Sequence, residues 1–122
     1  MAKKILVVDD EVHIIRILSD TLTRRGYDVV TGADGREAVE LALAEHPDLI
    51  FLDVMMPNMS GFEACQVLRR DHGLEVPIFL LTARGQERDV AEGEAAGATC
   101  YLTKPFSPRR LADLVDEALA GP

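Results

Sequence analysis

The chain has 122 residues, a length typical of one domain with a single hydrophobic core. Hydrophobic residues make up 48% of it and charged residues 28%, the composition of a folded globular protein rather than a disordered one. Thirteen basic residues against 21 acidic residues give a net charge of −8. The chain on its own is therefore not expected to bind nucleic acid or an anionic membrane surface.

Signals for export or membrane insertion are missing from the sequence. No apolar run approaches the roughly 20 residues of a membrane span, and the apolar run after Lys3 and Lys4 is too short for a signal peptide. Two cysteines, Cys65 and Cys100, are too few for a disulfide framework and are predicted to be inert core thiols. We expect one domain over residues 1–122, located in the cytoplasm.

Five short apolar runs are predicted to be β-strands. Successive runs begin roughly 20–30 residues apart, which leaves room for a crossover helix and is too long for a hairpin. Three of them are continuously apolar, as expected for strands covered on both faces of a parallel sheet. The runs are Ile5-Leu6-Val7-Val8, Asp28-Val29-Val30-Thr31, Leu49-Ile50-Phe51-Leu52, Ile78-Phe79-Leu80-Leu81 and Thr99-Cys100-Tyr101-Leu102.

Amphipathic stretches between and after these runs are predicted to be helices. Asp34, Ser60 and Ser107 are predicted to cap the second, third and fifth helices, the last with a proline at its first position. The first helix is expected to bury one face and to end at Gly26. The residues of that face are Val12, Ile15, Leu18 and Leu22.

The fourth helix, expected over 86–96, is predicted to be loosely docked. Its only large aliphatic residue is Val90, and Gly93 inside it costs about 1 kcal/mol relative to alanine. The alternation of strands and helices predicts an α/β fold, a (βα)5 doubly wound three-layer sandwich around a five-stranded parallel sheet.

Polar residues follow several of the predicted strands and should gather at the carboxyl edge of the sheet. Three carboxylates there would repel one another, so we expect a cation, and oxygen ligands without histidine or cysteine favour Mg²⁺. A lysine and a threonine beside them suit the oxygens of a phosphoryl group. The residues are Asp9, Asp10, Asp53, Thr82 and Lys104.

Together, these segments resemble the receiver domain of two-component response regulators. The likeness runs from about Lys3 to Leu119 and implies a flavodoxin-like sheet with strand order 2-1-3-4-5. Each segment alone is a weak signal, whereas all of them in this order and spacing are highly specific. They are Val7-Val8-Asp9-Asp10-Glu11, Leu52-Asp53-Val54-Met55-Met56-Pro57, Leu81-Thr82-Ala83 and Lys104-Pro105-Phe106.

The resemblance implies a role for each site residue. Asp53 matches the phosphoacceptor, which takes a phosphoryl group from a phosphohistidine. Asp10 and Asp53 match carboxylates that bind Mg²⁺ directly. Asp9 matches a carboxylate that acts through a bound water, and the backbone carbonyl of Met55 matches a further metal ligand.

The resemblance also implies a switch. Lys104 would pair with a phosphoryl oxygen, and the Lys104–Pro105 peptide bond would be cis. Thr82 would move toward another phosphoryl oxygen, and the ring of Tyr101 would fill the space it leaves. Met55 and Arg84 match positions that tune the lifetime of the acyl phosphate.

The expected partners are a sensor histidine kinase or histidine phosphotransfer protein, and an output domain or target protein. A phosphorylation-dependent homodimer is a further possibility, although Thr99 and Cys100 stand where related dimers often carry acidic residues. We expect a regulatory phosphoacceptor rather than an enzyme. The alternatives are a Mg²⁺-dependent phosphohydrolase and a pseudo-receiver that binds partners without phosphorylation. Met55 argues against the phosphohydrolase, because it stands where such an enzyme carries its acid/base residue.

Overall fold

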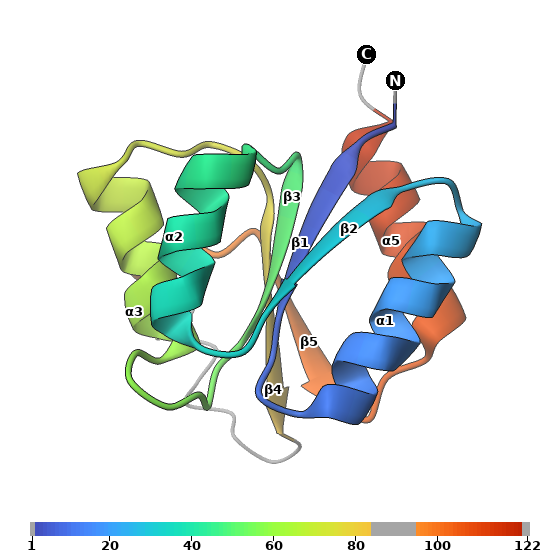
Figure 1. The fold of residues 1–122 in the computed structure, drawn as a ribbon, viewed down its shortest axis with the longest axis horizontal. Coiled ribbons are helices and arrows are strands. Elements are labelled where there is room, and N and C mark those ends of the chain that lie inside the picture. The colour runs from blue at the N-terminus through green and yellow to red at the C-terminus, as the bar shows by residue number, and fades with distance from the viewer. Residues whose placement is uncertain (1, 84–94, 121–122) are drawn as a thin grey trace.

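The computed structural model describes residues 2–83 and 95–120. Within them lies a five-stranded sheet of order β2-β1-β3-β4-β5, in which every neighbouring pair is parallel (Figure 1). The fold predicted from the sequence and from the resemblance is confirmed. The strands are β1 Lys4–Val8, β2 Asp28–Gly32, β3 Leu49–Asp53, β4 Ile78–Ala83 and β5 Cys100–Lys104.

Helices cover both faces of the sheet. Helices α1 (Val12–Arg24) and α5 (Pro108–Leu119) lie on one face, and α2 (Gly35–Glu45) and α3 (Gly61–Gln66) on the other (Figure 1). A π-helical segment, Val67–Asp71, extends α3. Successive residues of a strand point to opposite faces, so Ile5 of β1 joins the core under α1 and α5, and Leu6 joins the core under α2 and α3.

The predicted helix starts are present. Asp34 accepts a hydrogen bond from the backbone N–H of Glu37, and Ser60 and Glu63 form a reciprocal capping box. Ser107 accepts from the backbone N–H of Arg110. These caps fix where α2, α3 and α5 begin relative to the strands before them.

Three sequence-based expectations need correction. Val12, predicted to lie on the buried face of α1, is 71% exposed, because the first turn of α1 borders an open pocket beside Asp9 and Asp10. Cys65 is buried, whereas Cys100 is only partly buried. Thr99 does not start the fifth strand: its hydroxyl accepts from the N–H of Ile78, and β5 begins one residue later.

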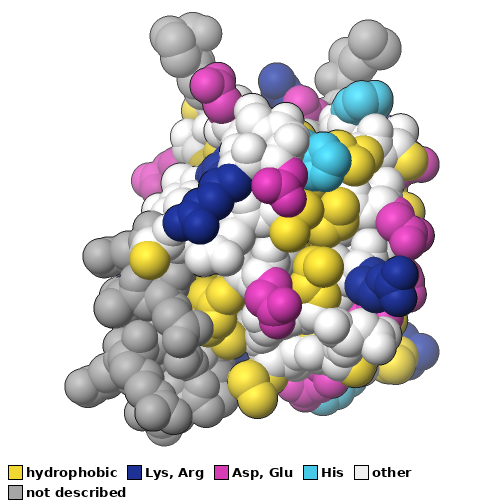
Figure 2. Space-filling model, turned by 90° about the vertical axis from the view of Figure 1, so that its left-hand side faces the viewer, with side chains coloured by type: hydrophobic (Ala, Val, Ile, Leu, Met, Phe, Trp, Pro, Cys, Tyr) yellow, Lys and Arg dark blue, Asp and Glu magenta, His cyan; other side chains and the backbone are white. Residues whose placement is uncertain are grey.

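The helix expected over 86–96 lies mostly outside the described residues, which include only its last part. Ala95 and Ala96 are helical there, and Ala96 is buried. No helix of the described part of the chain is long and apolar enough to cross a membrane. The face formed by α2 and α3 mixes hydrophobic, acidic and basic side chains (Figure 2).

Candidate functional site

Three carboxylates meet at the carboxyl edge of the sheet. Parallel pairing of Val8 with Leu52 brings the next residue of each chain segment, Asp9 and Asp53, side by side. Asp9 and Asp53 are almost completely buried, whereas Asp10 is exposed. One carboxylate oxygen from each of the three lies within 4.8 Å of the others. The predicted convergence of these residues is therefore present.

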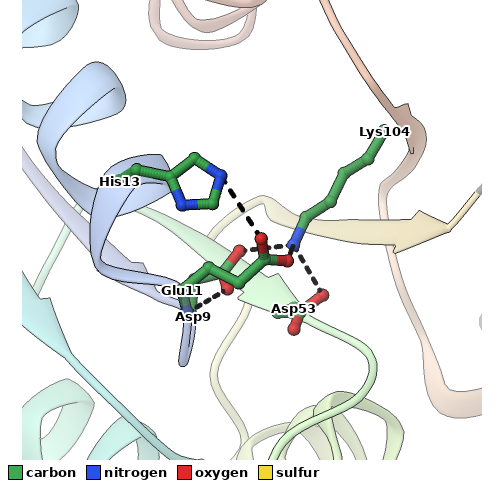
Figure 3. Close-up of polar contacts among 5 residues, drawn as sticks. All are labelled: Asp9, Glu11, His13, Asp53 and Lys104. Carbon is green, nitrogen blue, oxygen red and sulfur yellow. Dashed lines mark hydrogen bonds and ion pairs between the residues drawn. The ribbon is translucent and has the colours of Figure 1, made fainter.

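Lys104 reaches this cluster from the last position of β5. Its Nζ lies 2.8 Å from Oδ2 of Asp9, 3.0 Å from Oε1 of Glu11 and 3.2 Å from Oδ1 of Asp53 (Figure 3). The Lys104–Pro105 peptide bond that follows is cis. One ammonium group thus partly offsets the charge of three carboxylates.

Glu11 belongs to this arrangement and was not among the predicted site residues. It is the residue before α1, and its backbone N–H donates to Oδ1 of Asp9 at 2.9 Å. Its carboxylate contacts Lys104 and, at 3.4 Å, Nε2 of His13 (Figure 3). A third acid directly after the Asp9-Asp10 pair was the available signal, but the sequence does not show that its side chain turns toward Lys104.

The cluster changes the proton affinity of its members. Burial, assisted by the negative charge of Asp9, raises the pKa of Asp53 to about 7. Burial also raises the pKa of Asp9. Although burial alone would lower the pKa of Lys104, its bonds to Asp9 and Glu11 raise it. The bond from Lys104 lowers the pKa of Glu11.

The residues present suit a hard divalent cation. Asp9, Asp10 and Asp53 offer only oxygen ligands, and a single ammonium group, that of Lys104, lies against Asp9 and Asp53. The open side of Asp10 leaves space for water ligands, which small hard cations retain. The acidic cluster is thus compatible with divalent metal binding.

Three further predicted site residues, Thr82, Tyr101 and Met55, lie in the part of the chain that the structure describes. Thr82 is buried in β4, and Tyr101 of β5 pairs with Leu80. Thr82 is two residues beyond Leu80, so Thr82 and Tyr101 project from the same face of the sheet. Met55 is 67% exposed, two residues after Asp53. Arg84, assigned to lifetime tuning, lies outside the described residues.

The strand order and the acidic edge define the class of the protein, that of doubly wound α/β domains with a cluster of carboxylates at the strand ends. The family described as the response regulator receiver domain matches residues 5–116. The chain therefore belongs to that family, whose members are phosphoacceptor switches of two-component systems. The resemblance noted in the sequence is confirmed, and a phosphohydrolase or pseudo-receiver is not favoured.

Individual relatives agree with this assignment. The chain is 52% identical over 111 residues to the alkaline phosphatase synthesis transcriptional regulatory protein PhoP of Bacillus subtilis, covering 91% of this chain and 46% of that protein. It thus spans about half the length of this relative. Among solved structures, the chemotaxis response regulator CheY4 of Vibrio cholerae has a TM-score of 0.90 at 40% identity, covering 98% of this chain and 100% of that chain. The BeF3-activated DrrB receiver domain has a TM-score of 0.88 at 35% identity, covering 99% and 100%.

Proposed function

We propose that Asp53 accepts a phosphoryl group from a phosphohistidine of a sensor histidine kinase or a histidine phosphotransfer protein. A carboxylate oxygen of Asp53 attacks phosphorus, the P–N bond breaks, and its electron pair stays on the histidine nitrogen. The product is an acyl phosphate on Asp53. The observation that carries this proposal is the buried Asp53 carboxylate at the strand edge, 3.2 Å from Nζ of Lys104.

A divalent ion, for which we propose Mg²⁺, would be held by Asp10 and Asp53, by Asp9 through a water, and by the backbone carbonyl of Met55. When bound, it supplies positive charge that offsets the charge of the phosphoryl oxygens. Ionisation of Asp53 prepares its oxygen for attack, and Lys104 offers a positive hydrogen-bond donor for a phosphoryl oxygen. The close approach of the three carboxylates supports this ligand set.

We propose that Thr82 and Tyr101 transmit phosphorylation to the surface. A phosphoryl group adds about −1.5 to −2 charge and new acceptor oxygens, so a bond from Thr82 exists only in the phosphorylated state. Thr82 and Tyr101 project from the same face of neighbouring strands, which supports movement of the ring into space that Thr82 vacates. The surface expected to change includes the fourth helix, β5 and α5.

The phosphoryl lifetime is proposed to depend on Met55 and Arg84. Met55 is exposed beside Asp53, and its thioether does not orient a water molecule for attack as a carboxylate would. A long-lived acyl phosphate is therefore expected, and a lifetime of seconds on the isolated domain would contradict it.

We further propose a cytoplasmic receiver domain over residues 1–122 that controls an output domain or a target protein. The PhoP relative is named as a transcriptional regulatory protein, which makes a transcriptional output one candidate. The net charge of −8 argues against DNA contact by the receiver domain itself. We also propose that phosphorylation promotes dimerisation. Such a dimer would lack the salt bridges of related dimers, because Thr99 and Cys100 stand where those dimers often carry acidic residues.

The test is the intact mass of the protein after incubation with Mg²⁺ and a small phosphodonor such as acetyl phosphate. We expect the wild-type chain to gain one phosphoryl group and Asp53→Asn to gain none. Asp10→Asn should be phosphorylated more slowly. No mass gain in the folded wild-type chain would contradict the proposed function.

A further inference from the structure

Lys104 faces three carboxylates in the unphosphorylated protein. Its Nζ lies within 3.2 Å of carboxylate oxygens of Asp9, Glu11 and Asp53, and its contact with Oε1 of Glu11 is a hydrogen bond. The three partners differ in exposure: the side chain of Asp9 is 0% exposed, that of Asp53 8% and that of Glu11 46%. Glu11 is thus the partner that water can replace at least cost.

The side chain of Glu11 turns toward Lys104 and does not cap α1. Glu11 occupies the N-cap position of α1, where a side-chain oxygen can accept from the backbone N–H groups of the first helical turn. Its side chain makes no such bond and contacts Lys104 instead (Figure 3). Only the backbone carbonyl of Glu11 serves the helix, accepting from Ile14 and Ile15.

We propose that Glu11 is a positioning residue that holds Lys104 in the resting state and competes with the phosphoryl group for it. This inference rests on the proposed function and deepens it by naming what restrains the lysine before phosphorylation.

The competition follows from this hydrogen bond and from charge. The N–H group of Lys104 that donates to Glu11 can donate to a phosphoryl oxygen only after Glu11 releases it. Asp9 and Asp53 belong to the acidic cluster that would hold the cation, whereas Glu11 lies outside that cluster and is the most exposed of the three. The negative charge of Glu11 also opposes the arrival of an anionic phosphoryl group. Both effects favour the resting state.

The test is binding of BeF3⁻, a phosphoryl mimic, at saturating Mg²⁺, measured by titration calorimetry. In Glu11→Gln, the competing charge is removed, and the dissociation constant for BeF3⁻ is expected to fall about two- to fivefold, the range for a partly exposed ion pair. Glu11→Asp keeps the charge but shortens the side chain by one methylene, which withdraws it from Lys104. Its dissociation constant should fall as well, though less.

Glu40→Gln is the matched control because it removes the same charge from an exposed position on α2. Its dissociation constant should equal that of the wild type. The inference is overturned if Glu11→Gln binds BeF3⁻ no more tightly than the wild type does. It is also overturned if Glu11→Asp binds BeF3⁻ as the wild type does, or if Glu40→Gln gains as much affinity for BeF3⁻ as Glu11→Gln. If wild-type protein gains no phosphoryl group on Asp53, the proposed function fails; if it does gain one and Glu11→Gln binds BeF3⁻ as the wild type does, only this inference fails.

Discussion

At the scale of single residues, burial raises the proton affinity of Asp53 even though a lysine lies beside it. Lys104 contacts three carboxylates, yet burial and the nearby charge of Asp9 still raise the pKa of Asp53 to about 7. Asp53 is therefore partly protonated near neutral pH in the metal-free protein. Binding a cation or receiving a phosphoryl group requires that this proton leave.

The raised pKa of Asp53 predicts a pH dependence of stability. Between about pH 4, near its unfolded pKa, and about pH 7, folded Asp53 keeps a proton that the unfolded chain has lost. The free energy of unfolding should therefore fall as pH rises through this window, by roughly 2–4 kcal/mol from this group. Urea denaturation of the metal-free protein between pH 4 and pH 8 measures this slope.

Asp53→Asn provides the comparison, because an amide has no proton to lose in this range. It should match the wild type near pH 4 and exceed its stability at pH 8 by the same roughly 2–4 kcal/mol. If the free energy of unfolding changes with pH in the same way in both proteins, burial of ionised Asp53 does not destabilise the fold, and the prediction is wrong.

At the scale of elements, glycine allows α3 to pack against the strand that carries Asp53. A Cβ on Gly61 would lie 2.3 Å from the carbonyl oxygen of Asp53, and the Gly61 N–H donates to the carbonyl of Val54 at 3.0 Å. Because the obstacle is backbone, it cannot move without moving the strand end. The start of α3 and the position of Asp53 are thus coupled.

Gly61→Ala is expected to destabilise the protein by about 2–3 kcal/mol and to slow phosphorylation of Asp53. Gly73→Ala is the control: its Cβ would meet nothing within 4 Å, so only its positive φ of 64° is unfavourable, at about 1 kcal/mol. Thermal unfolding and phosphorylation rates of both variants test this. Equal losses in both, with a normal phosphorylation rate in Gly61→Ala, would contradict the coupling.

Arg69 joins the π-helical segment to the residues just before β4 and just before β5. Its Nε donates to the carbonyl of Gly97, its Nη1 to the carbonyls of Leu74 and Val76, and its Nη2 to the hydroxyl of Thr99. Bonds from a charged donor are stronger than neutral ones. The guanidinium therefore fixes where the chain enters β5.

Arg69→Met should lower the free energy of unfolding by about 2 kcal/mol, because several carbonyl groups lose their donor. Arg70→Met, at the exposed neighbouring position, should change it by less than about 0.5 kcal/mol. Urea denaturation measures the free energy of unfolding of the two variants. Similar values would contradict a stabilising role for the hydrogen bonds of Arg69.

At the scale of the whole molecule, the sequence specifies the architecture well and local geometry less well. The strands are predicted by apolar runs, and the starts of α2 and α3 by their capping residues Asp34 and Ser60. Both are local signals. The exposure of Val12 depends on where the first turn of α1 lies relative to the sheet edge. The contact between Glu11 and Lys104 joins residues 93 positions apart and depends on side-chain direction, which neither spacing nor hydrophobic pattern specifies.

The acidic edge predicts that global stability depends on divalent cations. Mg²⁺ binding to the folded state should stabilise the wild type by about 2.7 kcal/mol at 100 times the dissociation constant. Asp10→Asn should lose most of this stabilisation, whereas Asp20→Asn, an exposed change on α1, should keep it. Thermal unfolding with and without a chelator measures the difference. Equal stabilisation of Asp10→Asn would place the ion elsewhere.

The central claim is that Asp53 carries the phosphoryl group. An acyl phosphate is reduced by borohydride to homoserine, which marks the modified position permanently. After treatment with Mg²⁺, a small phosphodonor and borohydride, peptide mass spectrometry should find homoserine at position 53. Homoserine at another acidic residue, or an unmodified chain that is fully folded, would contradict the account.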